Sequence, residues 1–331
     1  MSNESQASTT TTQAPVNGAM NAALSTDTAR HNISKRPLKI GEKFVEFLLF
    51  LAGASGVVIT LGIVGTLLYE AAEYFEDVSI IEFLTGTSWG PQFEPPSHGV
   101  LPLITGTLTT TFVALLTALP IGTIVALWLS EYATPKLREA VKPALELLSA
   151  IPTVVFGYFA LLFVIPILQT VFAKFGYELA GFNMLGAGIV MGLMIVPYVA
   201  SMSEDAMGAV PKSLREGAYA MGATKFQTCV KVVLPAALSG VTAAYILAVS
   251  RALGETMIVA IAAGGKPTFT VNPLQQAQTL TAYIASVAKG DLPVGSIGFR
   301  AIFAVGLTLL VMTLAFNVMG HWLRQKYKEA Y

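Results

Sequence analysis

Six long apolar stretches constrain the fold of this chain more than any other feature of its sequence. They cover residues 44–69, 101–129, 145–172, 185–202, 236–263 and 300–323. A helix needs about 20 mainly apolar residues to cross the hydrocarbon core of a bilayer. Membrane β-barrels show segments of about ten residues with alternating polarity, and this sequence has none. The sequence therefore predicts an all-α membrane protein with six transmembrane helices.

Composition supports this fold class and excludes several kinds of function. Of the 331 residues, 54% are hydrophobic and 12% are charged, whereas soluble domains carry about 25% charged residues. Twenty Lys and Arg balance 20 Asp and Glu, so the net charge does not indicate nucleic-acid binding. Cys229 is the single cysteine, and the three histidines, His31, His98 and His321, lie far apart. We therefore expect neither a disulfide framework nor a metal site.

Basic residues predict the orientation of the six helices. Most of them fall before the first stretch, between the second and third, between the fourth and fifth, and after the sixth. The opposite ends of the helices carry only Lys174, Lys266, Lys289 and Arg300. Because cytoplasmic segments of membrane proteins are enriched in Lys and Arg, we expect both termini in the cytoplasm.

Two segments outside the helices have distinctive compositions. Residues 1–42 are rich in Ser, Thr, Ala, Asn and Gln, which predicts a disordered cytoplasmic tail before a transmembrane domain over 43–331. The first outer loop, 70–100, contains aromatic and acidic residues but no Lys or Arg. We expect short helices there on the membrane surface, serving either as an interfacial spacer or as a docking surface for an outside partner. Its acidic residues are Glu70, Glu73, Glu76, Asp77, Glu82 and Glu94.

The connection between the fourth and fifth stretches, 204–235, contains signals for two short helices on the cytoplasmic face. Ser213 with Glu216, and Thr224 with Gln227, have the spacing of capping boxes. A Gly suits the left-handed residue that ends many helices, and a glycine follows the first predicted helix at position 222. An ordinary amphipathic connector would also form such helices.

The wider spacing in this loop is more specific than the helices themselves. Glutamate, alanine and glycine are followed at fixed distances by an aliphatic residue and Leu-Pro; the segment contains Glu216, Gly217, Ala218, Gly222, Val232, Leu234 and Pro235. This pattern resembles the cytoplasmic EAA motif of permease subunits of bacterial ABC importers. Gly217 stands where the motif usually has Ala, and Val232 where it has Ile. The resemblance implies that the loop docks into a separate ATP-hydrolysing subunit, which binds ATP and Mg²⁺.

The alternative classes have less support. An embedded enzyme would need a nucleophile, a catalytic dyad or a metal cluster inside the stretches, and an ion channel or ion-coupled carrier would not need the docking motif. A nucleotide-binding Gly-x4-Gly-Lys-Ser/Thr sequence is absent, since Gly265-Lys266 is followed by Pro267. We therefore expect a permease subunit with no catalytic residue and no cofactor of its own.

Several segments indicate which kind of importer this is. Residues 250–257 read Ser-Arg-Ala-Leu-Gly-Glu-Thr-Met, and with 83–89, 99–108 and 148–157 they resemble permease subunits of phosphate ABC importers. The resemblance extends from about residue 43 to the end of the chain. It implies import of inorganic phosphate across the bacterial inner (plasma) membrane. The implied partners are a second permease subunit (PstA-like), two ATPase copies (PstB-like) and an extracytoplasmic phosphate-binding protein (PstS-like). Sulfate or molybdate is the alternative substrate.

Arg251 and Glu255 are the candidate residues of the substrate path. Arg251 lies about fifteen residues into the stretch 236–263, which predicts a position near the middle of the membrane. A charge there costs about 2.5–3.5 kcal/mol, so it should face the bundle interior or a wet cavity. Glu255 is one helical turn further along. Arg251 can form an ion pair with Glu255 or line an anion path, and the two roles are compatible. Arg suits phosphate because its planar fork donates two parallel hydrogen bonds.

Overall fold

The structure is a computed structural model that describes residues 40–290, 292–293 and 295–326. Contacts divide the chain into Met1–Gly62 and Ile63–Tyr331, and the two units are described separately. The predicted tail, 1–42, lies outside the described residues up to position 39. The first described helix, α2 (Ile40–Asp77), belongs to both units and runs eight residues into the predicted outer loop.

Among the described residues, five helical segments are long and apolar enough to cross a membrane, and a bent pair of helices can form a sixth span. The five segments are Gly41–Asp77, Leu101–Tyr132, Thr153–Lys174, Met184–Gly208 and Ile297–Trp322. The bent pair, Lys225–Ala236 and Leu238–Leu253, turns by 71°. The prediction of an all-α membrane protein is confirmed.

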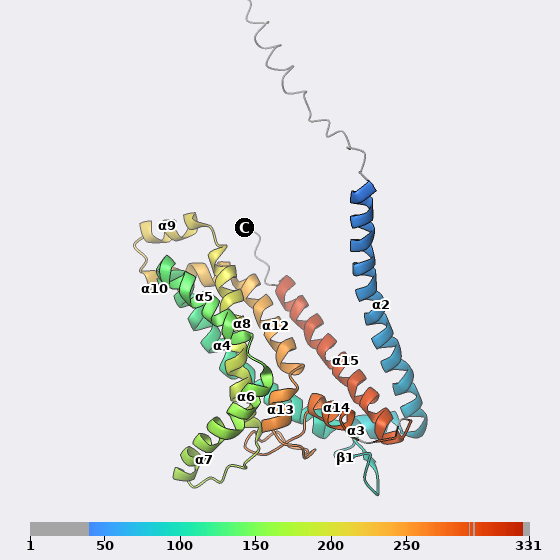
Figure 1. The fold of residues 1–331 in the computed structure, drawn as a ribbon. Coiled ribbons are helices and arrows are strands. Elements are labelled where there is room, and N and C mark those ends of the chain that lie inside the picture. The colour runs from blue at the N-terminus through green and yellow to red at the C-terminus, as the bar shows by residue number, and fades with distance from the viewer. Residues whose placement is uncertain (1–39, 291, 294, 327–331) are drawn as a thin grey trace, which may run out of the picture. The chain divides into compact units, whose positions relative to one another are not determined.

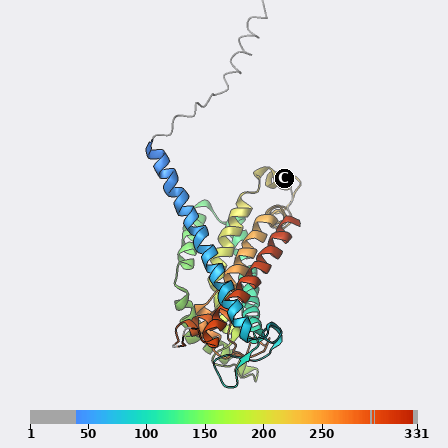
Figure 2. The same cartoon turned by 90° about the vertical axis from the view of Figure 1, so that its right-hand side faces the viewer.

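The named elements of these segments follow the chain closely. The second span is α4 (Leu101–Leu127) with the π-helix η1 (Trp128–Tyr132), and the fourth is α8 (Met184–Gly208). The third span joins three elements without a gap, α6 (Thr153–Phe159), η2 (Ala160–Val164) and α7 (Ile165–Lys174). The last is α15 (Ile297–Lys326). Figures 1 and 2 both show α15 lying beside α12 (Leu238–Leu253), with which it packs.

The predicted helix over 145–172 is wrong at its start. Residues 145–149 belong to α5 (Pro135–Ser149), a separate helix without buried residues that follows the cap Thr134. The third span begins only at Thr153. A residue before proline disfavours the helical conformation, and Ile151 precedes Pro152, which accounts for the break. Apolar content alone could not locate it, because Leu147 and Leu148 continue the hydrophobic run on the far side of the break.

The predicted helix over 236–263 is also wrong, because it is broken in the middle. Helix α12 ends at Leu253, and the short helix α13 (Met257–Ala262) begins three residues after Gly254. Toward the cytoplasmic loop, the chain is helical in α10 (Lys225–Thr228), η3 (Cys229–Val233) and α11 (Leu234–Ala236). The predicted fifth stretch therefore contains the end of α11, the 16-residue helix α12 and the short helix α13, and it is not one continuous helix.

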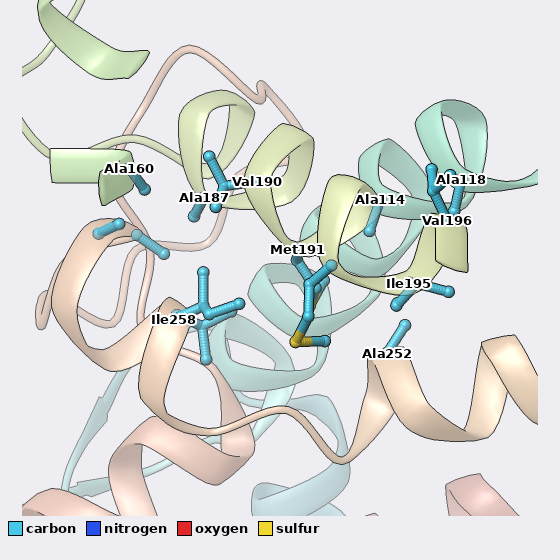
Figure 3. Packing of buried hydrophobic residues seen from close by; sticks show 14 of the residues in the cluster. Ala114, Ala118, Ala160, Ala187, Val190, Met191, Ile195, Val196, Ala252 and Ile258 are labelled. Carbon is cyan, nitrogen blue, oxygen red and sulfur yellow. The ribbon is translucent and has the colours of Figure 1, made fainter. Parts of the chain in front are cut away.

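The main core lies where α4 and α8 pack along their length. Most residues of α8 are buried, and they form a cluster with residues of α4, α12 and α13. In Figure 3, Ile195 of α8 lies between Ala114 of α4 and Ala252 of α12. Small residues allow this approach, as is common between membrane helices. A Cβ on Gly192 would lie 2.6 Å from the carbonyl oxygen of Ala114.

The other end of α4 is in contact with the predicted first outer loop, 70–100, and with the connection between α13 and α15, 263–296, which is predicted to lie on the same side. The first contains α3 (Ile80–Thr85) and a small hairpin of β1 (Trp89–Gly90) and β2 (Ser97–His98), and the second contains α14 (Leu280–Ala288). An aromatic cluster unites them, since Trp89 packs edge-to-face on both Phe83 and Tyr283. The expectation of short helices in 70–100 is therefore met by one helix, with a hairpin in addition.

The acidic side chains of the first outer loop are not all unpaired. Arg300, at the start of α15, donates to Glu73 at 2.6 Å and lies 3.9 Å from Asp77. These carboxylates belong to the last turns of α2. A basic residue more than 200 positions away in sequence thus neutralises part of the negative charge of the first outer loop. The composition of the loop alone could not reveal this pairing.

Candidate functional site

The loop 204–235, which the sequence predicts to be cytoplasmic and which is called the cytoplasmic loop below, folds into two short helices around a glycine turn. Helix α9 (Lys212–Ala220) is followed by Gly222, whose φ of +80° is the left-handed conformation that glycine adopts without strain. The amide of Ala223 donates to the carbonyl of Ala218 at 3.0 Å, and the amide of Gly222 to that of Tyr219 at 2.9 Å. These two bonds form a Schellman motif. The predicted stop at Gly222 is confirmed.

Of the two predicted capping boxes, one is present. Thr224 and Gln227 exchange both hydrogen bonds at the start of α10. The box of Ser213 and Glu216 is wrong, because α9 begins at Lys212, directly after Pro211. Ser213 is therefore already inside the helix, where its side chain cannot cap the first turn.

The EAA-like residues divide between a packed face and an open face. Glu216, Gly217, Gly222 and Pro235 are exposed, whereas Ala218, Val232 and Leu234 are half-buried. Next to them, Met221 is 89% exposed and Phe226 is 66% exposed. Large apolar side chains beside an exposed glycine turn make this loop suitable for contact with another protein.

Arg215 of α9 fastens the loop to the ends of two long helices. Its Nε and Nη2 donate to Oε1 of Glu131 in η1 at 3.0 and 2.9 Å. Its Nη1 and Nη2 donate to the carbonyls of Val210 and Met207, at the end of α8, at 2.6 and 2.8 Å. The side chains of Arg215 and Glu131 are only 16% and 6% exposed. Because a cation also suits the negative end of a helix, Arg215 serves α8 and η1 together.

A second ionic cluster fixes α5 to the same region. Lys142 donates to Oε2 of Glu204 at 2.9 Å and also pairs with Asp205, both in α8. Burial alone would lower the pKa of Lys142, but hydrogen bonds with Asp205 and Glu204 outweigh it and raise that pKa. Arg138 donates to the carbonyls of Leu129 and Ser130 and lies 3.4 Å from Glu204.

Sequence reasoning missed these two clusters. The paired residues are 62 to 84 positions apart, so no local spacing joins them. The sequence did contain one indication of these clusters. Glu131 and Glu204 lie at the ends of apolar stretches, and a buried carboxylate needs a basic partner. Between the clusters and α9 lies a cavity of about 370 Å³, lined by Arg138, Arg215, Glu131 and Glu216 among others.

Arg251 lies in the last turn of α12 and its side chain is exposed. Its guanidinium carbon is 6.0 Å from the ring centroid of Tyr198 in α8, within range of a cation–π contact. The helix ends two residues later, so Arg251 stands next to the break between α12 and α13 and not in the middle of a continuous helix. The ion pairs found among the described residues do not include it.

Glu255 is buried and faces the backbone of α13. Its Oε1 accepts hydrogen bonds from the amides of Met257 at 3.0 Å and Ile258 at 3.3 Å. Its carbonyl accepts from Oγ1 of Thr281 in α14 at 2.6 Å. The structure therefore does not pair Glu255 with Arg251, because the break at Gly254 replaces the continuous helix that would have put them on one face.

The comparisons with known proteins agree with this architecture. Residues 118–329 match the family described as binding-protein-dependent transport system inner membrane component. The "Probable ABC transporter permease protein YqgH" of Bacillus subtilis is 36% identical over 85% of this chain and 88% of its own length. The "Phosphate transport system permease protein PstC" of Mesorhizobium japonicum is 31% identical over 80% of this chain and 86% of its own.

A solved structure shows the same fold at low identity. The crystal structure of a bacterial ABC transporter involved in the import of the acidic polysaccharide alginate matches with a TM-score of 0.61 and 16% identity. The match covers 86% of this chain and 97% of that one. With the exposed glycine turn and the membrane-spanning helices, these relatives identify a transporter subunit and not an enzyme. The chain belongs to the family of binding-protein-dependent transport system inner membrane components, and is a multi-pass inner-membrane permease subunit of an ABC importer.

Proposed function

We propose that this permease subunit carries inorganic phosphate into the cytoplasm. The observation that carries the proposal is Arg251, a cation at a helix break within a span, without a carboxylate partner among the described residues. Relatives named as phosphate permeases support the same substrate. A permeating anion needs such a charge, since an unpaired phosphate loses much of its solvation on leaving water.

The surroundings of Arg251 suit a passing anion. Tyr198 offers its ring face to the guanidinium, which holds the charge without a competing carboxylate. Glu255 is engaged with the amides of Met257 and Ile258, so Arg251 keeps its donors for phosphate. Because Glu255 binds the first amides of α13 and not Arg251, we assign it a role in holding the break between α12 and α13 in place. It is not a direct ligand of the anion.

The proposed transporter contains several further subunits, one of which binds the loop around Gly222. The exposed turn at Gly222, with Glu216, Gly217 and Ala218 before it and Val232, Leu234 and Pro235 after it, docks into an ATPase subunit that binds ATP and Mg²⁺. The permease itself holds no cofactor. A second permease subunit, a second ATPase copy and an extracytoplasmic phosphate-binding protein complete the importer.

The test is phosphate uptake by the assembled transporter with Arg251→Gln and Arg251→Lys. We expect Arg251→Gln to abolish uptake while membrane insertion and co-purification of the ATPase persist. Arg251→Lys keeps the charge but loses the fork, so it should retain only part of the rate. Arg324→Gln, an exposed arginine near the end of α15, is the matched control and should transport normally.

Two results would contradict the proposal in different ways. Uptake by Arg251→Gln at the parental rate would remove Arg251 from the anion path. Accumulation of sulfate or molybdate in place of phosphate, in the parental transporter, would retain the anion path but replace the substrate.

A further inference from the structure

A second polar cavity lies at the opposite end of α4 from the cytoplasmic loop. It has a volume of about 490 Å³ and is formed by the hairpin strand β1, the chain that follows α13, and α14. The residues that matter for its chemistry are Trp89, Lys266, Gln276 and Tyr283. Since a water molecule takes about 30 Å³ in the liquid, the cavity has room for a small hydrated anion.

The walls of this cavity are firmly held. Trp89 is 5% exposed and Tyr283 is 2% exposed, and their rings meet edge-to-face at 5.1 Å. The carbonyl of Lys266 accepts hydrogen bonds from the amides of Thr268 at 2.9 Å and Gln278 at 3.0 Å. The amide of Leu280, at the start of α14, donates to Oγ1 of Thr107 in α4 at 3.0 Å. The cavity is thus a built feature of the outer end of the bundle.

The side chains that line the cavity carry a net positive charge. Lys266 is the one charged residue among those that line it. Nε1 of Trp89 and the hydroxyl of Tyr283, on two residues that line the cavity, are buried, and neither has a partner in good hydrogen-bond geometry among the described residues. An indole N–H can only donate, and a buried donor without an acceptor is unfavourable. Because Lys266 is charged and no carboxylate lines the cavity, the wall favours a ligand with negative charge and acceptor oxygens.

The tyrosine keeps its proton in this setting. Burial raises the pKa of the Tyr283 phenol, and the neighbouring Trp89 indole offsets only part of that increase. Tyr283 is therefore a neutral donor at physiological pH, and it does not add a negative charge that would repel an anion.

We propose that this cavity is the first binding site for the transported oxyanion on the permease, with Lys266 as the cation that attracts it. The proposal rests on the proposed function, because it places a phosphate-binding site ahead of Arg251. The chain between the two basic residues contains one helix, α13, whose six residues extend about 9 Å. An anion released at the outer surface thus meets Lys266 before it reaches the helix break.

Tryptophan fluorescence provides a direct test, because the chain has three tryptophans and one lies in the cavity. In the assembled transporter with Trp128→Phe and Trp322→Phe, Trp89 is the single tryptophan of this subunit. Tryptophan-free versions of the partner subunits isolate its signal. We expect phosphate, added without the binding protein, to change the Trp89 emission in a saturable manner.

Substitutions of lysine then define the site. Lys266→Gln should weaken phosphate binding by about tenfold or more, as expected for loss of a charge-assisted contact, and Lys266→Arg should retain it. Lys289→Gln is the matched control, because Lys289 follows α14 on the same side but does not line the cavity. Basal ATPase activity in each variant shows that the transporter is assembled.

The outcomes separate this inference from the proposed function. If no oxyanion changes the emission, or if Lys266→Gln leaves the titration unaltered, the cavity is not the site, whereas loss of uptake in Arg251→Gln would still support phosphate transport. If sulfate or molybdate saturates the signal and phosphate does not, the cavity stands as an oxyanion site and the proposed substrate is wrong.

Discussion

Two arginines, Arg215 in α9 and Arg251 in the last turn of α12, differ in the contacts that their guanidinium groups make. Arg215 makes four hydrogen bonds, two to Glu131 and two to carbonyls at the end of α8. Arg251 is exposed and contacts the ring of Tyr198. A half-buried arginine with a buried carboxylate partner joins the elements that it contacts, whereas an arginine without a carboxylate partner keeps its donors for other groups. The same residue type therefore joins helices in one place, whereas in the other the structure leaves its guanidinium without a carboxylate partner among the described residues.

Removing Glu131 should loosen the cytoplasmic loop. Glu131→Gln removes the carboxylate partner of the half-buried Arg215, which keeps only the carbonyls of Val210 and Met207; loss of a charge-assisted hydrogen bond of this kind costs about 1.5–3 kcal/mol. We expect a lower thermal unfolding temperature and fewer substrate molecules imported per ATP hydrolysed. Arg215→Gln should have a similar effect, and the double variant should be less damaging than the sum of both, with a coupling of about 0.5–3 kcal/mol.

Lys212→Gln is the control for this pair. Lys212 is an exposed residue of the same helix that lines the same cavity, and none of the ion pairs among the described residues includes it. Parental stability and parental coupling in Glu131→Gln would show that the ion pair is dispensable. Strictly additive effects in the double variant would show that the two side chains act independently.

Sequence reasoning at the residue scale succeeded where spacing is local. The glycine stop at position 222 and the box of Thr224 and Gln227 were predicted from neighbours within a few positions, and both are confirmed. The expected side-by-side placement of Arg251 and Glu255 assumed a continuous helix, which Gly254 ends. The roles of both residues in transport remain predictions, since the structure gives their positions and not their action.

At the scale of elements, the helices were predictable but their packing partners were not. The lengths of the apolar stretches predicted where the spans lie. Which spans pack most closely depends on where glycine residues allow two helices to approach. In α8, a Cβ on Gly188 would lie 2.7 Å from Cβ of Val113, and one on Gly192 would lie 2.6 Å from the carbonyl oxygen of Ala114. Both neighbours belong to α4. Glycine occurs throughout the chain, so its presence in a stretch does not reveal which helix it faces.

Gly192→Ala tests this close packing. The added methyl group would overlap the backbone of α4, which cannot move away as a flexible side chain could, so we expect a loss of about 1–3 kcal/mol of stability. Gly208→Ala, at the end of the same helix with no atom within 4 Å of the new Cβ, is the control. Because alanine favours a helix more than glycine, its stability should be unchanged or higher by up to about 1 kcal/mol. Equal unfolding temperatures for Gly192→Ala and the parental protein would rule out the proposed tight contact.

At the scale of the whole molecule, the number of spans follows from the sequence more securely than their construction. Five spans are single helical segments, and the sixth requires a pair bent by 71°. The wrong boundaries, at 145–172 and 236–263, both arose because apolar residues continue across a break. A hydropathy pattern measures solvent preference, whereas Pro152 and Gly254 act on the backbone. The far partners of Arg215, Arg300 and Lys142 depend on the tertiary fold, which no local pattern contains.

Cysteine labelling tests the orientation, which remains a prediction from the distribution of Lys and Arg. Cys229 is the single native cysteine and is 2% exposed, so the parental chain should react little with a charged maleimide. Ser88→Cys, exposed before β1, should react from outside intact cells, and Met221→Cys, in the cytoplasmic loop, only after the membrane is opened. Since Met221 borders the surface proposed for ATPase docking, its labelling should also decrease when the ATPase subunit is present, while that of Ser88→Cys should not. Reaction of Met221→Cys in intact cells would reverse the proposed topology. Equal labelling with and without the ATPase would move the docking surface away from this turn.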